Sequence, residues 1–244
     1  LGLDPFAVRR ANLLAAPTFT FNDLWVNSYG LPECIDWVEQ ASGWQDRKGK
    51  LGPNRGLGMA CSHYVSGASK PVNWTGEPHA TVNLKLDFDG SITLLTGAAE
   101  IGQGSSTVLV QCVAEILGLD MSRVRIVASD SEITPKDNGS YSSRVTYMVG
   151  NAAIDAAKNL MKVLVSAAAR KLDVPEDAVE CFGEIYRAAS QDRGMTFDEV
   201  VMAALEGTGT ITVKGNYDTL PESHGGKKYR GAAIGGSMAY SYAA

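Results

Sequence analysis

Cysteine and histidine are both scarce in this sequence, and neither is arranged as a metal site. The 244 residues include four cysteines and three histidines. No two cysteines form a Cys-x-x-Cys pair and no histidine lies near one at ligand spacing, so the sequence predicts neither zinc nor iron–sulfur ligation by this chain. We interpret the cysteines as buried free thiols of a protein in a reducing compartment. They are Cys34, Cys61, Cys112 and Cys181.

Long apolar runs and an excess of basic residues are missing as well. No apolar run reaches the length of about 18 residues that indicates a membrane span. The first residues show neither the charged nor the apolar segment of a signal peptide, so we expect a cytoplasmic protein. The formal net charge of -5 and the pI near 5.3 leave no basic face for a nucleic-acid backbone. We therefore expect no membrane and no nucleic-acid partner.

What is present is the composition of an ordinary globular protein. Apolar residues make up 45% and charged residues 20% of the chain, which is long enough for one large or two modest domains. Hairpin signals alternate with amphipathic helical stretches and do not repeat a strand–helix–strand unit. This pattern predicts an α+β fold with mixed sheets and packed crossover helices. We expect a division into residues 1–100 and 101–244.

The helices are predicted from apolar periodicity and capping residues. Asp4 can cap the first of them. In the second, Ile35, Trp37 and Val38 are expected to face inward. Small residues on one side of the longest helix, Gly150 among them, favour close packing against another backbone. The predicted helices span residues 5–14, 32–44, 105–117, 145–172 and 197–205.

The strands are predicted from alternation and turn residues. Residues 80–88 alternate strictly, which places Val82, Leu84, Leu86 and Phe88 on one face. Asp-Gly follows as a hairpin turn and leads to a return strand. The predicted strands span residues 80–88, 91–96, 124–128, 179–188, 210–217 and 236–243.

A glycine-rich loop at residues 100–107 stands directly before a predicted helix. Gly102 and Gly104 permit a close approach of the backbone to a ligand. The first amides of a helix attract anions, Gln103 offers a donor and an acceptor, and hydroxyls follow as far as Thr107. The alternative interpretation is a plain helix cap with a flexible entry, since serine and threonine are preferred caps.

A second polar loop, residues 138–144, also leads into a helix. Four hydroxyl side chains and a guanidinium give it dense hydrogen-bonding capacity, and arginine suits a bidentate phosphate contact. The alternative is a polar capped loop with one solvated arginine. The candidate ligand-binding residues of this loop are Ser140, Tyr141, Ser142, Ser143 and Arg144.

Other chemistries find little support. The glycine loop lacks the lysine of a Walker loop, which disfavours nucleotide hydrolysis, and no Ser-His-Asp order or Gly-x-Ser-x-Gly elbow indicates a serine hydrolase. A phosphate-binding hydrolase would lack a nucleophile–base pair. His63 is expected in the core or a cleft, whereas His79 and His224 are expected in solvated loops.

Together the two loops, with Gly-Asn-Ala at residues 150–152, resemble the cofactor-binding pair of the xanthine oxidase family of molybdenum hydroxylases. The opening Leu-Gly-Leu-Asp-Pro with Arg9 and Asn12 resembles the helix before the second half of the family's large subunit. Residues 63–67, 74–90 and 134–144 resemble the large (alpha) subunit of 4-hydroxybenzoyl-CoA reductase more closely. The resemblance covers essentially the whole chain.

This resemblance implies a molybdenum centre held as molybdopterin cytosine dinucleotide, with iron–sulfur clusters and FAD on partner subunits. The implied reaction is reductive dehydroxylation of 4-hydroxybenzoyl-CoA, or hydroxylation of a related aromatic or heterocycle. Val145 departs from the family, many of whose members carry serine there. The implied cofactor-binding residues are Gly102, Gln103, Gly104, Thr107, Ser140, Tyr141, Ser142, Ser143 and Arg144.

Several motifs of the family are missing from the sequence, among them the upstream Gly-Gly-Phe-Gly loop and the downstream Gly-x-Gly-Glu motif. We therefore expect an internal fragment of the large subunit that holds no catalytic or metal-ligating residue and is inactive by itself. Residues 1–100 would end the first cofactor-binding subdomain, and residues 101–244 would hold the cofactor-contacting helices and begin the second. The alternative is a truncated, inactive module that keeps the fold for binding or interaction.

Overall fold

The computed structural model describes residues 2–21, 25–70, 76–188, 193–219 and 234–244. The chain forms two compact units, one made of Leu1–Ala68 with Leu220–Ala244 and a larger one made of Ser69–Thr219. These units differ from the expected division after residue 100, because the strands before that residue pack on the helices after it. The expected division concerns subdomains of a longer subunit and stays a prediction.

A four-stranded mixed sheet with the order β10-β4-β5-β6 forms the base of the larger unit. β4 pairs antiparallel with β5 and with β10, whereas β5 and β6 are parallel because α4 (Ser105–Leu117) carries the chain across between them. Hairpin and crossover together confirm the α+β fold. The strands span Ala80–Leu86 (β4), Ile92–Thr96 (β5), Val124–Ala128 (β6) and Ile211–Tyr217 (β10).

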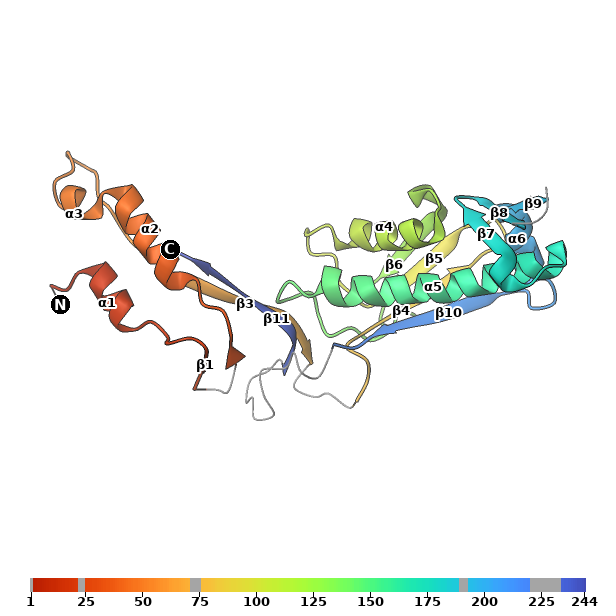
Figure 1. Cartoon of the computed structure of the whole chain (residues 1–244), viewed down its shortest axis with the longest axis horizontal. Helices are drawn as coiled ribbons and strands as arrows, with labels where there is room; N and C mark the ends of the chain where they lie inside the picture. The colour runs from red at the N-terminus through yellow and green to blue at the C-terminus, as the bar shows by residue number, and fades with distance from the viewer. Residues whose placement is uncertain (1, 22–24, 71–75, 189–192, 220–233) are drawn as a thin grey trace. The chain divides into compact units, whose positions relative to one another are not determined.

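Two helices cover one face of this sheet (Figure 1). α4 and α5 (Val145–Leu172) lie side by side and have the predicted bounds. The alternating buried positions of β4 face them and form the core with the apolar side of α5. The close backbone approach to α5 lies at Gly215 of β10, where an added Cβ would be 2.2 Å from backbone atoms of that helix. Gly150 was expected to pack against another backbone, but an added Cβ there would have only Cys112 Sγ of α4 within 4 Å.

A small three-stranded sheet and a short helix complete the larger unit. The predicted strand at 179–188 is wrong as a single element, because Gly183, with φ +57°, turns the chain between β7 and β8. The predicted helix at 197–205 is confirmed as α6, with a capping box between Thr196 and Glu199. The elements span Val179–Phe182 (β7), Ile185–Ala188 (β8), Gly194–Thr196 (β9) and Phe197–Leu205 (α6), with 3-10 turns at Met121–Arg123 and Glu176–Ala178.

The smaller unit packs three helices around a small core. Asp4 caps α1 as predicted, and its other oxygen accepts a hydrogen bond of 2.9 Å from Trp44 Nε1. β3 pairs with β11, and the short pair of β1 with β2 was not predicted. The core consists of Phe6, Leu31, Ile35 and Trp44. The elements span Pro5–Ala11 (α1), Thr18–Phe19 (β1), Trp25–Val26 (β2), Leu31–Ser42 (α2), Trp44–Arg47 (α3), Ser62–Lys70 (β3) and Ile234–Ala243 (β11).

Two large apolar side chains lie outside the core, contrary to the predicted patterns. Trp37 of α2 is 70% exposed, because Ile35 and Val38 already face the core of that helix. Phe88 is 60% exposed, because β4 ends at Leu86 and the chain turns directly after it. Helix and strand periodicity therefore placed most of the core correctly and failed at these two positions.

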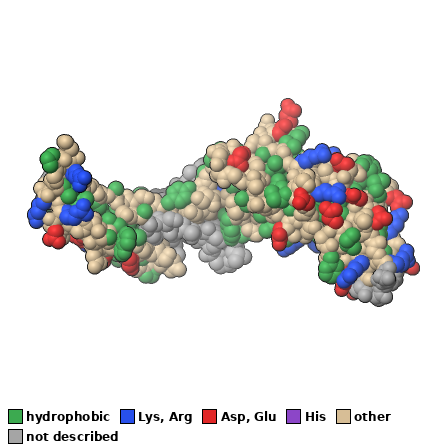
Figure 2. All heavy atoms as spheres, turned by 90° about the horizontal axis from the view of Figure 1, so that it is seen from above, with side chains coloured by type: hydrophobic (Ala, Val, Ile, Leu, Met, Phe, Trp, Pro, Cys, Tyr) green, Lys and Arg blue, Asp and Glu red, His purple; other side chains and the backbone are tan. Residues whose placement is uncertain are grey.

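The charged surface and the helices agree with the absence of a basic face and of a membrane span that the composition indicates. Basic and acidic side chains alternate over the larger unit on the face shown in Figure 2. None of the helices in the described part of the chain combines the length and the apolar character of a membrane span. The four cysteines are free thiols, as expected, but each of them is half-buried and not buried.

Candidate functional site

The two candidate loops lie at the same edge of the four-stranded sheet. β5 and β6 are parallel, so their carboxyl ends point the same way, and each is followed by one of the loops. The first loop leads into α4 and the second into α5, and Figure 1 shows the beginnings of both helices side by side. Ligand sites of open sheets with parallel strands commonly form at such an edge.

One main-chain oxygen joins the two loops. The carbonyl oxygen of Ala99 accepts a hydrogen bond of 3.0 Å from Gln103 Nε2 and one of 2.7 Å from Ser140 Oγ. The backbones are also close, since a Cβ on Gly97 would lie only 2.2 Å from the carbonyl oxygen of Pro135. The structure therefore brings together the two loops that the sequence singled out.

The first loop is shaped by a residue that the sequence analysis left without a role. The carboxylate of Glu100 accepts hydrogen bonds from the amides of Gly102, Gly104 and Ser106 at 2.9, 3.0 and 3.0 Å. These amides, with those of Ser106 and Gly104 contributing most, lower the pKa of Glu100 from 4.5 to about 2. An internal carboxylate thus stands where an external anion was expected.

Gln103 lies on the surface with both amide protons in use. Its Nε2 donates to Ser105 Oγ at 2.8 Å as well as to Ala99, and its Oε1 accepts from the amide of Ile101 at 2.6 Å. Among these groups, the second lone pair of Gln103 Oε1 can still accept a hydrogen bond. Gly102, Gly104 and Thr107 are exposed too. Nothing lies within 4 Å of a Cβ built on either glycine.

The second loop enters α5 through a strained backbone. Ser142 and Ser143 have φ values of 52° and 47°, which residues other than glycine rarely adopt. Such strain collects at ligand and active sites. Ser142 is buried, whereas Tyr141 and Ser143 are exposed and Ser140 is half-buried. Tyr141 and Ser143 therefore present hydroxyl groups at this edge of the sheet.

Arg144 has a different environment from the one expected. It is fully buried, and its guanidinium donates to Asp137 Oδ1 at 3.2 Å and to the carbonyl oxygens of Gly139 at 3.1 Å and His79 at 2.6 Å. The arginine is therefore not solvated, because Asp137, directly before the loop, supplies the carboxylate partner. In this chain its charge holds the loop against the beginning of β4.

His79 extends this buried network to the end of β10. The sequence did not predict this structural role. His79 is 3% exposed instead of solvated, and its Nδ1 accepts a hydrogen bond of 3.0 Å from the amide of Thr219. Its own amide donates to Asp218 at 3.1 Å. These bonds tie the beginning of β4 to the end of β10. His63, expected inside, is exposed, and His224 lies outside the described residues.

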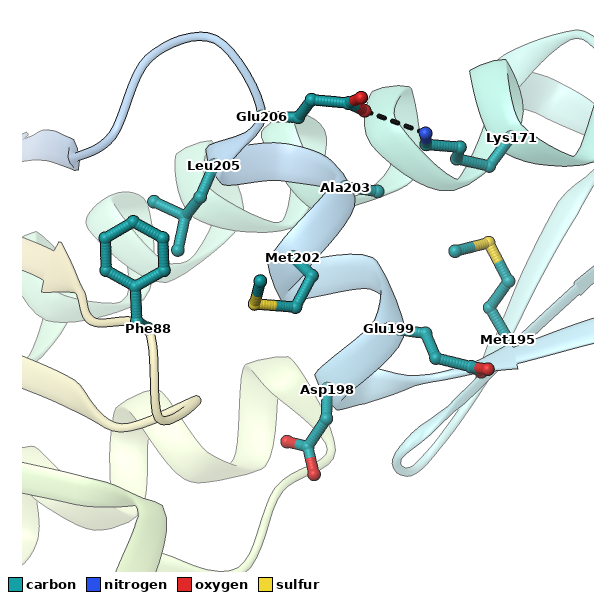
Figure 3. Close-up of a pocket in the computed structure, with 9 residues that line it drawn as sticks. All are labelled: Phe88, Lys171, Met195, Asp198, Glu199, Met202, Ala203, Leu205 and Glu206. Carbon is teal, nitrogen blue, oxygen red and sulfur yellow. Dashed lines mark ion pairs between the residues drawn. The ribbon is translucent and has the colours of Figure 1, made fainter.

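No metal-ligand cluster accompanies the loops in the described residues. Among those residues no three His, Cys, Asp or Glu side chains gather as metal ligands. A shallow groove of about 660 Å³ lies beside α6 (Figure 3). It reaches Lys171 near the end of α5, whereas the second loop lies at the beginning of that helix. Its carboxylates have partners within the chain, such as Lys171 for Glu206 at 2.7 Å. The groove therefore has no part in the candidate site.

Residues 33–244, which include both loops, match the family model described as "Molybdopterin cofactor-binding domain". The chain belongs to this family. It is 36% identical over 180 residues to the xanthine dehydrogenase molybdenum-binding subunit of Escherichia coli O157:H7, which covers 69% of the chain and 23% of that relative. It is 28% identical over 194 residues to the nicotine 6-hydroxylase large subunit of Paenarthrobacter nicotinovorans, covering 72% of the chain and 23% of that relative.

Solved structures show the same fold. Quinoline 2-oxidoreductase from Pseudomonas putida 86 aligns with a TM-score of 0.59 and 23% identity over 89% of the chain and 30% of the quinoline enzyme. CO dehydrogenase from Oligotropha carboxidovorans aligns with a TM-score of 0.59 and 19% identity over 90% of the chain and 30% of that chain. The molybdopterin-binding chain thus spans about a quarter of the length of these relatives. The closer likeness to 4-hydroxybenzoyl-CoA reductase stays a prediction.

Proposed function

We propose that this molybdopterin-binding chain is part of a molybdenum hydroxylase-type oxidoreductase and that both loops contact the cofactor. The observation that carries the proposal is the meeting of Gln103 and Ser140 at the carbonyl oxygen of Ala99. Two helix-leading loops with surface hydroxyl and amide groups converge there, and both lie within the residues matched by the family model.

The residues at this edge suit a large polar ligand. Gly102 and Gly104 leave open space over the main chain, so a flat ring system can approach the first loop closely. The exposed hydroxyls of Tyr141 and Ser143, and that of Ser140, can bind its polar substituents. Thr107 adds a further hydroxyl on the first turns of α4.

In this proposal Arg144 is a positioning residue and does not contact the cofactor. Because its guanidinium is buried among Asp137, Gly139 and His79, it holds the second loop in shape beneath the ligand. Molybdopterin-bound molybdenum would supply the two-electron redox chemistry. The chain's own residues bind and orient that group, and none of the candidate residues is assigned a proton-transfer role.

The finer assignments follow the resemblance to the xanthine oxidase family. We propose molybdopterin cytosine dinucleotide as the cofactor, and iron–sulfur and FAD subunits together with the remainder of the large subunit as partners. The proposed substrates are an aromatic CoA thioester, such as 4-hydroxybenzoyl-CoA, or a heterocycle. Relatives named for xanthine and for nicotine support the heterocycle. A cytoplasmic location stays an expectation from the sequence.

Molybdenum content of the intact subunit tests the site. Gln103→Ala and Ser140→Ala each remove a side chain that would orient the cofactor, and one net hydrogen bond is worth about 0.5–1.5 kcal/mol, or about 2–10-fold in affinity. We expect molybdenum per subunit to fall by that factor under limiting cofactor. Elemental analysis measures it, together with the melting temperature of the cofactor-free protein.

Matched controls lie near the same loops. Gln111→Ala removes an exposed glutamine from α4, and Ser131→Ala removes an exposed serine from the segment between β6 and the second loop. Both should leave the molybdenum content unchanged. Full molybdenum content in both Gln103→Ala and Ser140→Ala would contradict the assignment of these loops to the cofactor. An intact wild-type subunit without molybdenum would favour the inactive module instead.

A further inference from the structure

The beginning of α4 is an anion site that the chain itself has filled. The first amides of a helix have no partner within the helix and carry partial positive charge. Here Glu100 Oε1 accepts from the amides of Gly102 and Gly104, and Oε2 accepts from the amide of Ser106. Both carboxylate oxygens are therefore used, at distances of 2.9 to 3.0 Å.

The same carboxylate fixes the surroundings of Gln103. Two of its bonds go to the residues on either side of that glutamine. Ser105 Oγ lies 3.4 Å from Glu100 Oε2 and also accepts the hydrogen bond from Gln103 Nε2. The glutamine side chain is thereby directed to Ala99, where Ser140 arrives from the second loop.

We propose that Glu100 is a positioning residue whose carboxylate fills the beginning of α4 and holds Gln103 beside the second loop. Its value for cofactor binding rests on the proposed function, whereas its hold on the loop does not. A phosphate group of a ligand is excluded from the α4 amides while this carboxylate occupies them. The glycine loop therefore meets its ligand through Gln103 and the open faces of Gly102 and Gly104.

Chemical rescue of the 244-residue chain tests the proposal without any cofactor. In Glu100→Ala the three amides of Gly102, Gly104 and Ser106 lose their acceptor, so inorganic phosphate or formate can take its place. We expect saturable amide chemical-shift changes at these three residues on adding phosphate to Glu100→Ala. The same addition should leave them unchanged in the wild type. Formate should restore part of the melting temperature that Glu100→Ala loses.

Glu115→Ala is the matched control, because Glu115 is an exposed glutamate near the end of α4, away from the three amides. Neither phosphate nor formate should change its melting temperature relative to the wild type. Phosphate binding to the three amides of the wild-type chain would overturn the proposal. So would a Glu100→Ala chain that keeps its native melting temperature, or one whose amides do not respond to either anion.

The pH dependence of the melting temperature distinguishes a role of the Glu100 charge from a role of packing alone. The folded-state pKa of Glu100 is lowered to about 2 from 4.5, so its charge stabilises the fold fully above pH 4.5 and progressively less as pH falls towards 2. The wild type should therefore melt above Glu100→Gln at neutral pH, and the difference should vanish between pH 4.5 and 2. A difference that does not depend on pH would contradict the proposed role of the charge.

Molybdenum content then separates this proposal from the proposed function. In the intact subunit we expect Glu100→Gln to hold several-fold less molybdenum, with Glu115→Gln unchanged. If the wild-type subunit binds no molybdenum while the phosphate and pH results hold, the proposed function alone fails. If the wild type binds molybdenum but the three amides of Glu100→Ala ignore both anions, the role of Glu100 alone fails.

Discussion

We expect the replacement of Arg144 by methionine to lower the free energy of unfolding of the larger unit by about 3–5 kcal/mol, the range for breaking a buried ion pair. The change leaves the carboxylate of Asp137, which is 4% exposed, without its charged partner. It also deprives the carbonyl oxygens of Gly139 and His79 of a donor. Denaturant unfolding followed by circular dichroism measures the loss.

An exposed ion pair of the same residue types provides the control. Arg125 contacts Asp89 at 3.2 Å, and both side chains are more than half exposed. Arg125→Met should cost about 0–1 kcal/mol. A double variant that also replaces Asp137 by asparagine should lose less than the sum of the two single variants, because the unpaired charge is gone. Equal losses for Arg144→Met and Arg125→Met would refute the structural role of Arg144.

We expect Gly215→Ala to lower the free energy of unfolding by about 3 kcal/mol, at the upper end of overpacking effects. A Cβ at this position of β10 would lie 2.2 Å from the carbonyl oxygen of Ala152 and 2.2 Å from the amide nitrogen of Ala156. Both atoms belong to the backbone of α5, so no side-chain rotation relieves the clash. The helix must move away from the sheet, and thermal unfolding of the variant shows the result.

The opposite sign is expected at the other glycine of this contact region. Gly150 lies inside α5, and a Cβ there would meet only Cys112 Sγ at an ordinary distance of 3.7 Å. Gly150→Ala should therefore gain about 0.5–1 kcal/mol from helix propensity. A stability gain in both variants, or a loss in both, would contradict the packing of α5 between α4 and β10.

Local patterns predicted most of the elements of the larger unit. The sequence predicts α4, α5 and α6 to their bounds, because each has an apolar face, and Gly104 and Thr196 mark the starts of α4 and α6. β7 and β8 were merged, since both are short and similar in composition and only Gly183 separates them. Phe88 was misplaced because alternation alone cannot show where a strand ends.

The sequence predicted the two loops of the candidate site but not the buried network of Arg144 and His79 behind the second loop. The two loops are visible as glycine and hydroxyl clusters before helices, and their meeting follows from the parallel order of β5 and β6. Arg144 and Thr219 bond to His79 from 65 and 140 residues away, and no local pattern reveals such partners. Glu100 could have been found, because acidic side chains are stabilised near the amino end of a helix.

The link between the loops through the oxygen of Ala99 has a consequence for natural variation and for mutational screens. A main-chain carbonyl is common to all amino acids, so changes of residue 99 keep the acceptor and leave the link intact wherever the new side chain fits. The donors have no such protection, because they belong to the side chains of Gln103 and Ser140. Saturation mutagenesis of the intact subunit, scored by molybdenum content, should therefore tolerate most changes at position 99 and few at positions 103 and 140. All three residues nevertheless take part in the same pair of hydrogen bonds.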